Sequence, residues 1–107
     1  MDIRHYLTAS GHDPYQEWLD QLKDLTGRVA IQRCVDRVAG GNFGERRFLQ
    51  ESVWELKIDV GPGYRVYYVQ ESTTVVLLLC GGSKRTQTAD IKTAVKYWLD
   101  YQRRRKA

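Results

Sequence analysis

The sequence is poor in the residues that build disulfide frameworks and metal sites. It contains two cysteines, two histidines and two prolines in 107 residues. Cys34 falls in a predicted helix and Cys80 ends an apolar strand. Both are interpreted as small core residues, and two cysteines alone do not imply a disulfide. His5, His12 and the cysteines lack the spacing of metal ligands. We therefore expect no disulfide scaffold, no metal and no cofactor.

Long apolar runs are also missing. No segment approaches the roughly 18 apolar residues of a membrane-spanning helix. The first five residues, Met-Asp-Ile-Arg-His, lack the apolar stretch of a signal peptide. We expect a cytoplasmic protein without a membrane partner.

The length and charge predict one basic globular domain. A chain of 107 residues, 42% hydrophobic and 28% charged, suits a single domain over residues 1–107 with a modest core. The formal net charge is +4. This balance permits a polyanionic partner, but a generally basic surface explains it equally well.

A β-hairpin is the clearest pattern in the chain. Apolar and charged residues alternate from position 54 to 59, which is the period of a half-buried strand. Gly61-Pro62-Gly63 supplies a turn before a second strand over 64–70. With a three-residue loop, Asp59 pairs with Arg65 and Lys57 with Tyr67. One face of the hairpin is then apolar, and the other carries Glu55 and these four residues.

The first half of the chain predicts one strand and two helices. A short strand covers residues 2–8, and Asp13-Pro14 is a strong helix start, with Asp as the cap and Pro at the first helical position. Thr26 caps a second helix, which Gly40-Gly41 ends. The two helices are expected to cover one face of a sheet. Residues 40–52 are expected to form a polar connection.

The second half predicts a buried strand and a closing helix. Residues 74–80 are apolar on both faces, as in an interior strand, and Gly81-Gly82-Ser83 is expected to break the sheet. Thr88 is expected to cap the last helix, whose basic end is Arg103–Lys106. The predicted class is α+β, with the element order β-α-α-β-β-β-α.

Four segments carry a family resemblance. They are Trp-Glu-Leu-Lys-Ile-Asp at 54–59, Gly-Pro-Gly-Tyr-Arg-Val-Tyr-Tyr at 61–68, Leu-Leu-Cys-Gly-Gly-Ser-Lys at 78–84 and Ala-Val-Lys-Tyr-Trp at 94–98. Together they resemble the RelE/ParE toxin superfamily, in its HigB-type branch of addiction module killer proteins. The resemblance covers nearly the whole chain. It implies a RelE-like fold with a mostly antiparallel sheet, packed by an N-terminal helical hairpin and a C-terminal helix.

The resemblance also implies an activity and partners. Such proteins are toxins of type II toxin–antitoxin systems, and many are metal-free endoribonucleases that cut mRNA on the ribosome and inhibit translation. The implied partners are a HigA-like helix-turn-helix antitoxin, the ribosome and mRNA, with operator DNA reached only through the antitoxin complex. ParE-type relatives instead inhibit DNA gyrase without cutting RNA.

Site residues follow from matching positions. Lys57 lies where RelE-type enzymes place a catalytic strand lysine, Arg65 matches the arginine after Gly-Tyr, and Arg85 matches the basic residue after the last strand. Glu55 stands where RelE has a second lysine, and Ile91 where RelE has a functional tyrosine. Both departures bear on the identity of the acid and the base.

The chemistry of RNA cleavage assigns roles to these residues. A base takes the proton of the 2′-hydroxyl, cations stabilise the phosphorane, and an acid protonates the leaving oxygen. Arg65 and Arg85 suit the cationic role, because guanidinium binds phosphate in a bidentate fork. Lys57 is the first choice for proton transfer and Glu55 the second. The expected RNA-binding residues are Lys84, Tyr67, Arg46 and Arg47.

Plainer explanations compete with these roles. A cross-strand ion pair without a catalytic role would explain Asp59 and Arg65, and a solvated turn would explain Lys84-Arg85. The tryptophans at positions 18, 54 and 98 are interpreted as core residues. Three functions therefore stand beside one another: an endoribonuclease toxin, a gyrase inhibitor, and a nucleic-acid-binding module without toxicity. Glu55 and Lys57 on the face of Arg65 favour the first.

Overall fold

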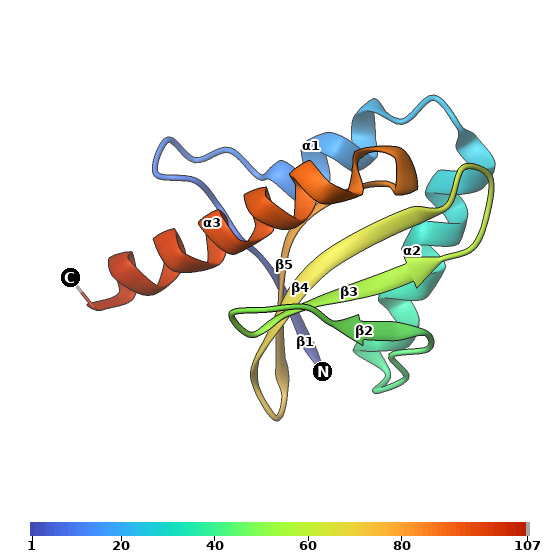
Figure 1. Ribbon diagram of the computed structural model, residues 1–107. Coiled ribbons are helices and arrows are strands. Elements are labelled where there is room, and N and C mark those ends of the chain that lie inside the picture. The colour runs from blue at the N-terminus through green and yellow to red at the C-terminus, as the bar shows by residue number, and fades with distance from the viewer. Residues whose placement is uncertain (107) are drawn as a thin grey trace.

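The protein consists of a five-stranded sheet with helices on both faces (Figure 1). The structure is a computed structural model and describes residues 1–106. The elements in chain order are β1 (Asp2–His5), α1 (Pro14–Gln21), α2 (Leu25–Ala39), β2 (Arg46–Phe48), β3 (Val53–Ile58), β4 (Tyr64–Ser72), β5 (Val75–Ser83), the short 3-10 helix η1 (Lys84–Thr86) and α3 (Gln87–Lys106). The α+β class is confirmed.

The sheet is mixed, so the expected mostly antiparallel sheet is wrong. Its strand order is β1-β5-β4-β3-β2, and β1 runs parallel to β5 while the other neighbours are antiparallel. The expected element order also lacked β2, which pairs Arg46–Phe48 with Trp54–Leu56. All three residues of β2 are exposed, so this edge strand has no hydrophobic alternation that would predict it.

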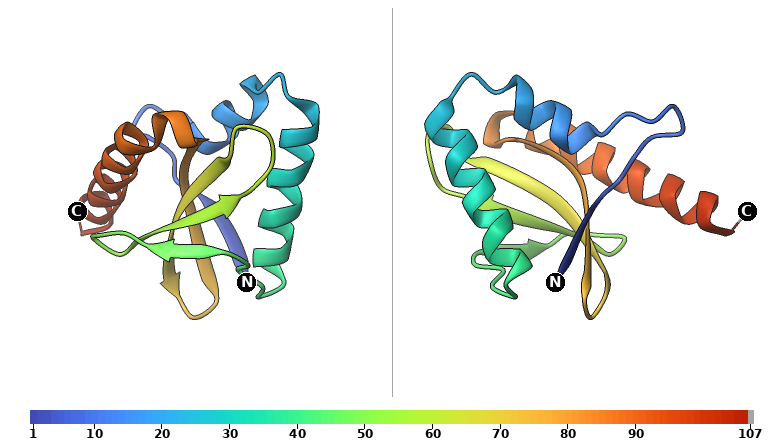
Figure 2. Two further views of the ribbon diagram at one scale, coloured as in Figure 1. Left: turned by 45° about the vertical axis from the view of Figure 1, so that its right-hand side comes forward. Right: turned by 180° about the vertical axis from the view of Figure 1, so that it is seen from behind.

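Helices cover the two faces of the sheet separately (Figure 2). The first core cluster joins α1 and α2 to one face, and includes Leu56, Val66 and Tyr68. The second joins α3 to the other face, and includes Tyr67 and Ala94. The helical hairpin covers one face of the sheet, as predicted, and the C-terminal helix packs on the opposite face.

The hairpin keeps its predicted faces in a different register. Lys57 is opposite Arg65, and Glu55 is opposite Tyr67, which is two positions away from the predicted pairing. The predicted pairing of Asp59 with Arg65 is wrong, because Asp59 lies in the loop. The loop spans 59–63, and Gly61 and Gly63 both adopt positive φ there, at 56° and 81°. A shift by two preserves the side-chain alternation, so the apolar and polar faces stay separate.

Helix starts are partly as expected. Asp13 caps α1 by accepting a hydrogen bond from the Gln16 amide, which confirms the prediction. Asp24 rather than Thr26 caps α2, by accepting from the Gly27 amide at 3.0 Å. The prediction for Thr88 is wrong as well, because η1 leads into α3 at Gln87.

The last strand continues through the predicted break. Gly81 and Gly82 pair with Val66 and Arg65, so β5 ends only at Ser83. Their lack of side chains reflects packing, because a Cβ atom at Gly81 would overlap the ring of Trp18 and one at Gly82 would overlap the carboxylate of Asp90. Glycine here permits close approach rather than a turn.

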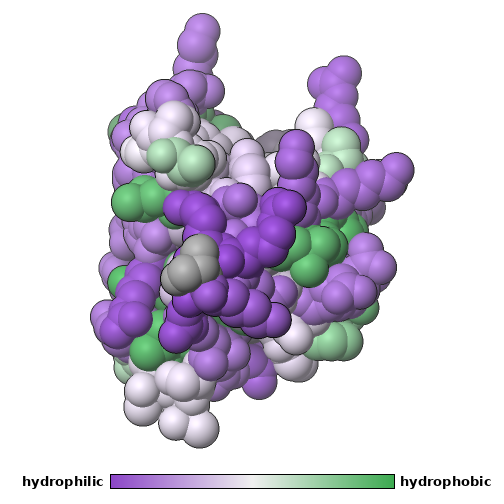
Figure 3. Space-filling model, turned by 90° about the vertical axis from the view of Figure 1, so that its left-hand side faces the viewer, coloured by the Kyte–Doolittle hydropathy of each residue, from purple (hydrophilic) through white to green (hydrophobic). Residues whose placement is uncertain are grey.

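The C-terminal helix extends past the sheet (Figure 1). Its last turn carries Arg103, Arg104, Arg105 and Lys106. The surface at this end of the molecule is strongly hydrophilic (Figure 3). Arg104 and Arg103 pair with Asp100, so part of this charge is locally balanced.

Candidate functional site

A polar hollow lies on the α3 face of the sheet, where β2, β3 and β4 extend beside the start of α3. Its volume is about 450 Å³. We call it the Arg65 hollow. The residues that line it are Glu45, Arg46, Arg47, Glu55, Lys57, Arg65 and Gln87. Three cationic side chains, Arg47, Lys57 and Arg65, and two anionic ones therefore surround one open space.

Arg65 is the central cation of this hollow. Its exposed fraction is only 6%, and its Nη1 donates to the carbonyl oxygen of Gly63 at 3.0 Å. Its buried Nε has no hydrogen-bond partner, and in residues 1–106 no carboxylate forms an ion pair with it. A buried charge without a counter-ion is costly. The arrangement therefore favours an anion beside Arg65.

Lys57 stands directly opposite Arg65 on the neighbouring strand. Its Nζ lies 3.6 Å from Glu45 Oε1, and its side chain is 39% exposed. Lys57 thus presents a cation at the mouth of the hollow, while Arg65 presents one at its floor.

Glu55 is a nearly buried carboxylate, with an exposed fraction of 4%. Gln87 Nε2 donates to its Oε2 at 2.8 Å, and Arg47 Nη2 lies 3.4 Å from its Oε1. Both oxygens are held in place, and each keeps further acceptor capacity. The hollow therefore combines an oriented proton acceptor with cations.

Tyr67 lies beneath the hollow and not in it. Its side chain is fully buried in the core cluster under α3, opposite Glu55. Burial, and then the negative charge of Glu55, raises the pKa of Tyr67 well above its usual range. Its hydroxyl lacks a hydrogen-bond partner within the described chain. The predicted stacking of Tyr67 on a base does not fit this placement, because α3 covers the ring.

The remaining predicted residues divide between two places. Arg46 borders the hollow, but its side chain lies on the α2 face of the sheet, with its guanidinium over the rings of Phe43 and Trp54, at 4.3 and 4.5 Å from their centroids. Lys84 and Arg85 lie on η1 and do not line the Arg65 hollow. The side chains of four predicted residues thus meet there: Glu55, Lys57, Arg65 and Arg47.

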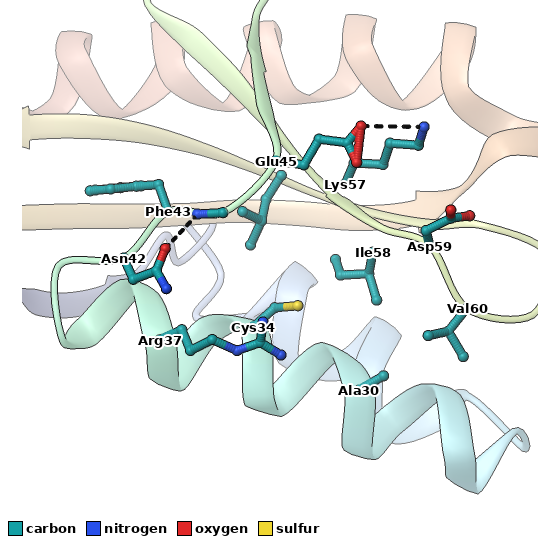
Figure 4. A pocket seen from close by; sticks show the side chains of 12 residues that line it. Ala30, Cys34, Arg37, Asn42, Phe43, Glu45, Lys57, Ile58, Asp59 and Val60 are labelled. Carbon is teal, nitrogen blue, oxygen red and sulfur yellow. Dashed lines mark hydrogen bonds and ion pairs between the residues drawn. The ribbon is translucent and has the colours of Figure 1, made fainter.

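A smaller apolar hollow adjoins this site between α2 and β3 (Figure 4). Its volume is about 280 Å³, and Cys34 points into it from α2 toward β3. Glu45 and Lys57 are among the lining residues of both hollows, and their ion pair lies on the side of β3 that faces away from α2 (Figure 4).

Comparison with known proteins places the chain in a family. No family model matches the sequence. An uncharacterized protein of Haemophilus influenzae is 42% identical over 80 residues, which are 75% of this chain and 81% of that protein. The chain belongs to the same family as this Haemophilus protein. This relative is itself uncharacterized, so we base the functional proposal on the site.

Sequence reasoning missed two residues of the candidate site. Gln87 holds Glu55 from the first residue of α3, and Glu45 pairs with Lys57 from the segment before β2. Both lie outside the hairpin pattern that located the other residues. The polar residues after Ser83 are the only sequence signal for Gln87.

Two further findings concern what the described residues lack. No helix within residues 1–106 has the length and apolar character needed to cross a membrane. Over the same residues, no three histidine, cysteine, aspartate or glutamate side chains gather as a metal site would require.

Proposed function

We propose that the protein is the toxin of a type II toxin–antitoxin pair, an endoribonuclease that cleaves mRNA on the ribosome. The observation that carries this proposal is the buried Arg65 guanidinium, which has an unpartnered Nε and no carboxylate partner in residues 1–106. A phosphodiester supplies the missing anion, and guanidinium matches its oxygens in geometry. The sequence resemblance to HigB-type toxins supports the same activity.

The proposed reaction uses the RNA's own 2′-hydroxyl as nucleophile. A bond forms between the 2′-oxygen and phosphorus while the bond from phosphorus to the 5′-oxygen breaks. The products are a 2′,3′-cyclic phosphate and a 5′-hydroxyl. Arg65 and Lys57 stabilise the charge that develops on the phosphorane oxygens. Such stabilisation is effective because Arg65 is already fixed by Gly63 and needs no reorganisation.

Glu55 is the proposed base. Its carboxylate is an acceptor-only group that Gln87 and Arg47 orient within the hollow. It takes the proton of the 2′-hydroxyl. The Lys57 ammonium then gives a proton to the leaving 5′-oxygen, and exchange with solvent restores both groups. This assignment reverses the order preferred from sequence, because Lys57 is paired as a cation with Glu45.

The proposed partners follow from the proposed activity. The ribosome presents the mRNA, and the cationic end of α3 adds salt-sensitive attraction to ribosomal RNA. A HigA-like helix-turn-helix antitoxin neutralises the toxin, and operator DNA is bound only through that complex.

Expression and primer extension test the activity. Inducible expression of the wild type should halt translation and growth, whereas Arg65→Ala should not. Purified protein should then produce new 5′ ends in one mRNA, and parallel reactions with and without ribosomes measure ribosome dependence. Arg33→Ala is the matched control, because Arg33 is an exposed arginine of α2 that does not line the hollow.

Other outcomes would identify the competing functions. Filamentation and DNA damage signalling with intact mRNA would indicate a gyrase inhibitor. Unaffected growth at high expression would indicate a non-toxic binding module. Co-expression of a small adjacent reading frame should restore growth, and failure of any neighbour to bind or rescue would count against the toxin–antitoxin proposal.

A further inference from the structure

A second hollow lies at the open end of β5, where Pro62 of the Gly61–Gly63 turn is one of its lining residues. Its volume is about 500 Å³. The pairing of β1 with β5 ends at Leu78, so no strand of the described chain covers the outer edge of Gly81–Ser83. The residues that define its chemistry are Trp18, Pro62, Ser83, Arg85, Thr86 and Asp90. We call it the Trp18 hollow.

Trp18 supplies an aromatic wall. Its six-membered ring lies so close to the backbone of Gly81 that no side chain fits between them. The indole is half-buried, and Pro62 and Leu22 continue the apolar wall around it. A planar apolar surface of this kind suits a nucleobase, because every base has a face that stacks on an aromatic ring.

Two charged groups face the same space. Arg85 is exposed and forms no ion pair within residues 1–106. Asp90 accepts a hydrogen bond from the Thr86 hydroxyl through Oδ2, and Oδ1 is not engaged by that bond. A guanidinium recognises phosphate, whereas a carboxylate can only accept hydrogen bonds. The hollow thus offers separate positions for a phosphate and for a donor group on a base.

The two hollows share one backbone group. The carbonyl oxygen of Gly63 accepts from Arg65 Nη1 at 3.0 Å and from the Lys84 amide at 2.8 Å. Lys84 immediately precedes Arg85 in η1. The carbonyl group of Gly63 therefore connects Arg65 with the segment that carries Arg85, so the two hollows adjoin the same turn.

We propose that the Trp18 hollow binds a nucleotide next to the scissile phosphate, with its base on Trp18, its phosphate on Arg85 and its amino group donating to Asp90. The proposal rests on the proposed RNA substrate and deepens it. Adenine, cytosine and guanine carry an exocyclic amino group, whereas the single base donor of uracil, its ring N3–H, is flanked by two carbonyl oxygens that repel a carboxylate. The hollow therefore selects against uridine at this position.

Nucleotide binding to the isolated full-length chain tests this inference without cleavage. The probes are the 5′-monophosphates of adenosine, cytidine, guanosine and uridine, and the readout is the indole N–H signal of Trp18 in ¹H–¹⁵N NMR. Trp18→Phe assigns that signal among the three tryptophans. We expect the three amino-bearing nucleotides to move it, with uridine monophosphate about fivefold weaker, as one lost hydrogen bond predicts.

Surface variants make the test specific. Arg85→Ala should weaken binding about tenfold through loss of a charged contact, and Asp90→Asn should abolish the preference against uridine. Arg33→Ala should bind like the wild type. Arg65→Met should also keep nucleotide binding at Trp18, because Arg65 lies in the other hollow.

Several results would overturn the inference. These are an unmoved Trp18 signal with every nucleotide, full binding by Arg85→Ala, or an equal response to inorganic phosphate alone. A response to an extended penta-alanine peptide but not to nucleotides would make the β5 edge a strand-docking site instead. Binding without any RNA cleavage would defeat only the proposed activity, whereas cleavage that ignores Arg85 and Asp90 would defeat only this inference.

Discussion

Lys57 and Arg65 are cross-strand partners, so two positively charged side chains stand opposite each other on one face of the sheet. Like charges at directly opposed positions destabilise a sheet. Glu45 balances Lys57, but no carboxylate in residues 1–106 balances Arg65. The folded chain therefore maintains an unfavourable arrangement that an anionic ligand would relieve.

Arg65→Met should separate activity from stability. Loss of the guanidinium is expected to lower the rate of RNA cleavage by about 10²–10³, as removal of one charge-stabilising donor does. The free energy of unfolding should stay equal or rise by about 1 kcal/mol, because an unpaired buried charge is replaced by an apolar side chain of similar length. Urea titration measures the stability and single-turnover cleavage the rate.

Added phosphate provides an internal control for that variant. Inorganic phosphate should raise the melting temperature of the wild type more than that of Arg65→Met, because ligand binding to the native state adds stability and the variant lacks the Arg65 site. A marked loss of stability in Arg65→Met would instead assign Arg65 a structural role.

Lys57→Arg and Glu55→Gln should distinguish a proton-transfer group from a cation. Arginine keeps the positive charge but cannot transfer a proton near neutral pH. If Glu55 is the base, Glu55→Gln should lose about 10²–10⁴ in single-turnover cleavage, the usual contribution of general acid–base catalysis. Lys57→Arg should lose rate only if Lys57 is the acid. Normal cleavage by both variants would mean that the protein acts by positioning the RNA for in-line attack.

Gly81→Ala should destabilise the fold although alanine favours regular structure. The added methyl group would meet the ring of Trp18, and overpacking of this kind costs about 1–3 kcal/mol. Gly40→Ala is the matched control, because Gly40 has a φ of −82° and a Cβ atom there would meet only the carbonyl oxygens of Arg37 and Asp36, at 3.5 and 3.9 Å. Its effect should stay within about 0.5 kcal/mol. Equal urea midpoints for the two variants would contradict the packing explanation.

Tyr6 should make the protein less stable in alkali. Burial, together with the hydrogen bond from its hydroxyl to Asp100 Oδ2 at 2.6 Å, raises the pKa of Tyr6 to about 12. The native state thus holds the phenol proton more tightly than the unfolded chain, in which the pKa is about 10. This stabilisation is complete below about pH 10 and is lost as the pH rises toward 12.

Urea midpoints at pH 8, 10 and 11 measure this loss. Tyr6→Phe should reduce the free energy of unfolding by about 1 kcal/mol at pH 8, because it removes one hydrogen bond. From pH 8 to 11 this variant should lose less further stability than the wild type. The same pH dependence in both proteins would show that Tyr6 does not contribute to it.

Hydrophobic alternation predicted the faces of the hairpin but not its register. The pattern has a period of two, so a shift of two positions leaves Leu56 and Val66 on the apolar face and Lys57 and Arg65 on the polar face. Loop length decides between such registers, and Gly61-Pro62-Gly63 is compatible with a loop of three residues or five. The parallel pairing of β1 with β5 could not be predicted either, because the sequence of a strand does not specify the direction of its partner.

Sequence analysis predicted those residues of the candidate site that the hairpin contributes. Glu55, Lys57 and Arg65 share a face because of local alternation, and the structure places all three in one hollow. Gln87 reaches that hollow only through the packing of α3, which local sequence does not encode. Arg85 lies in a different hollow, because β5 continues through two glycines that were interpreted as a break.

The parallel pairing of β1 with β5 bears on the timing of folding during synthesis. Asp2 pairs with Val75, and the hydrogen bond from Tyr6 to Asp100 joins positions separated by 94 residues. The first strand made is therefore the last to find its neighbours. At roughly 5–20 residues per second, residues 2–5 wait about 4–15 seconds until β5 has been synthesised. A nascent chain that stops before residue 75 contains the hairpin with Lys57 and Arg65 but lacks the strand that anchors its own beginning.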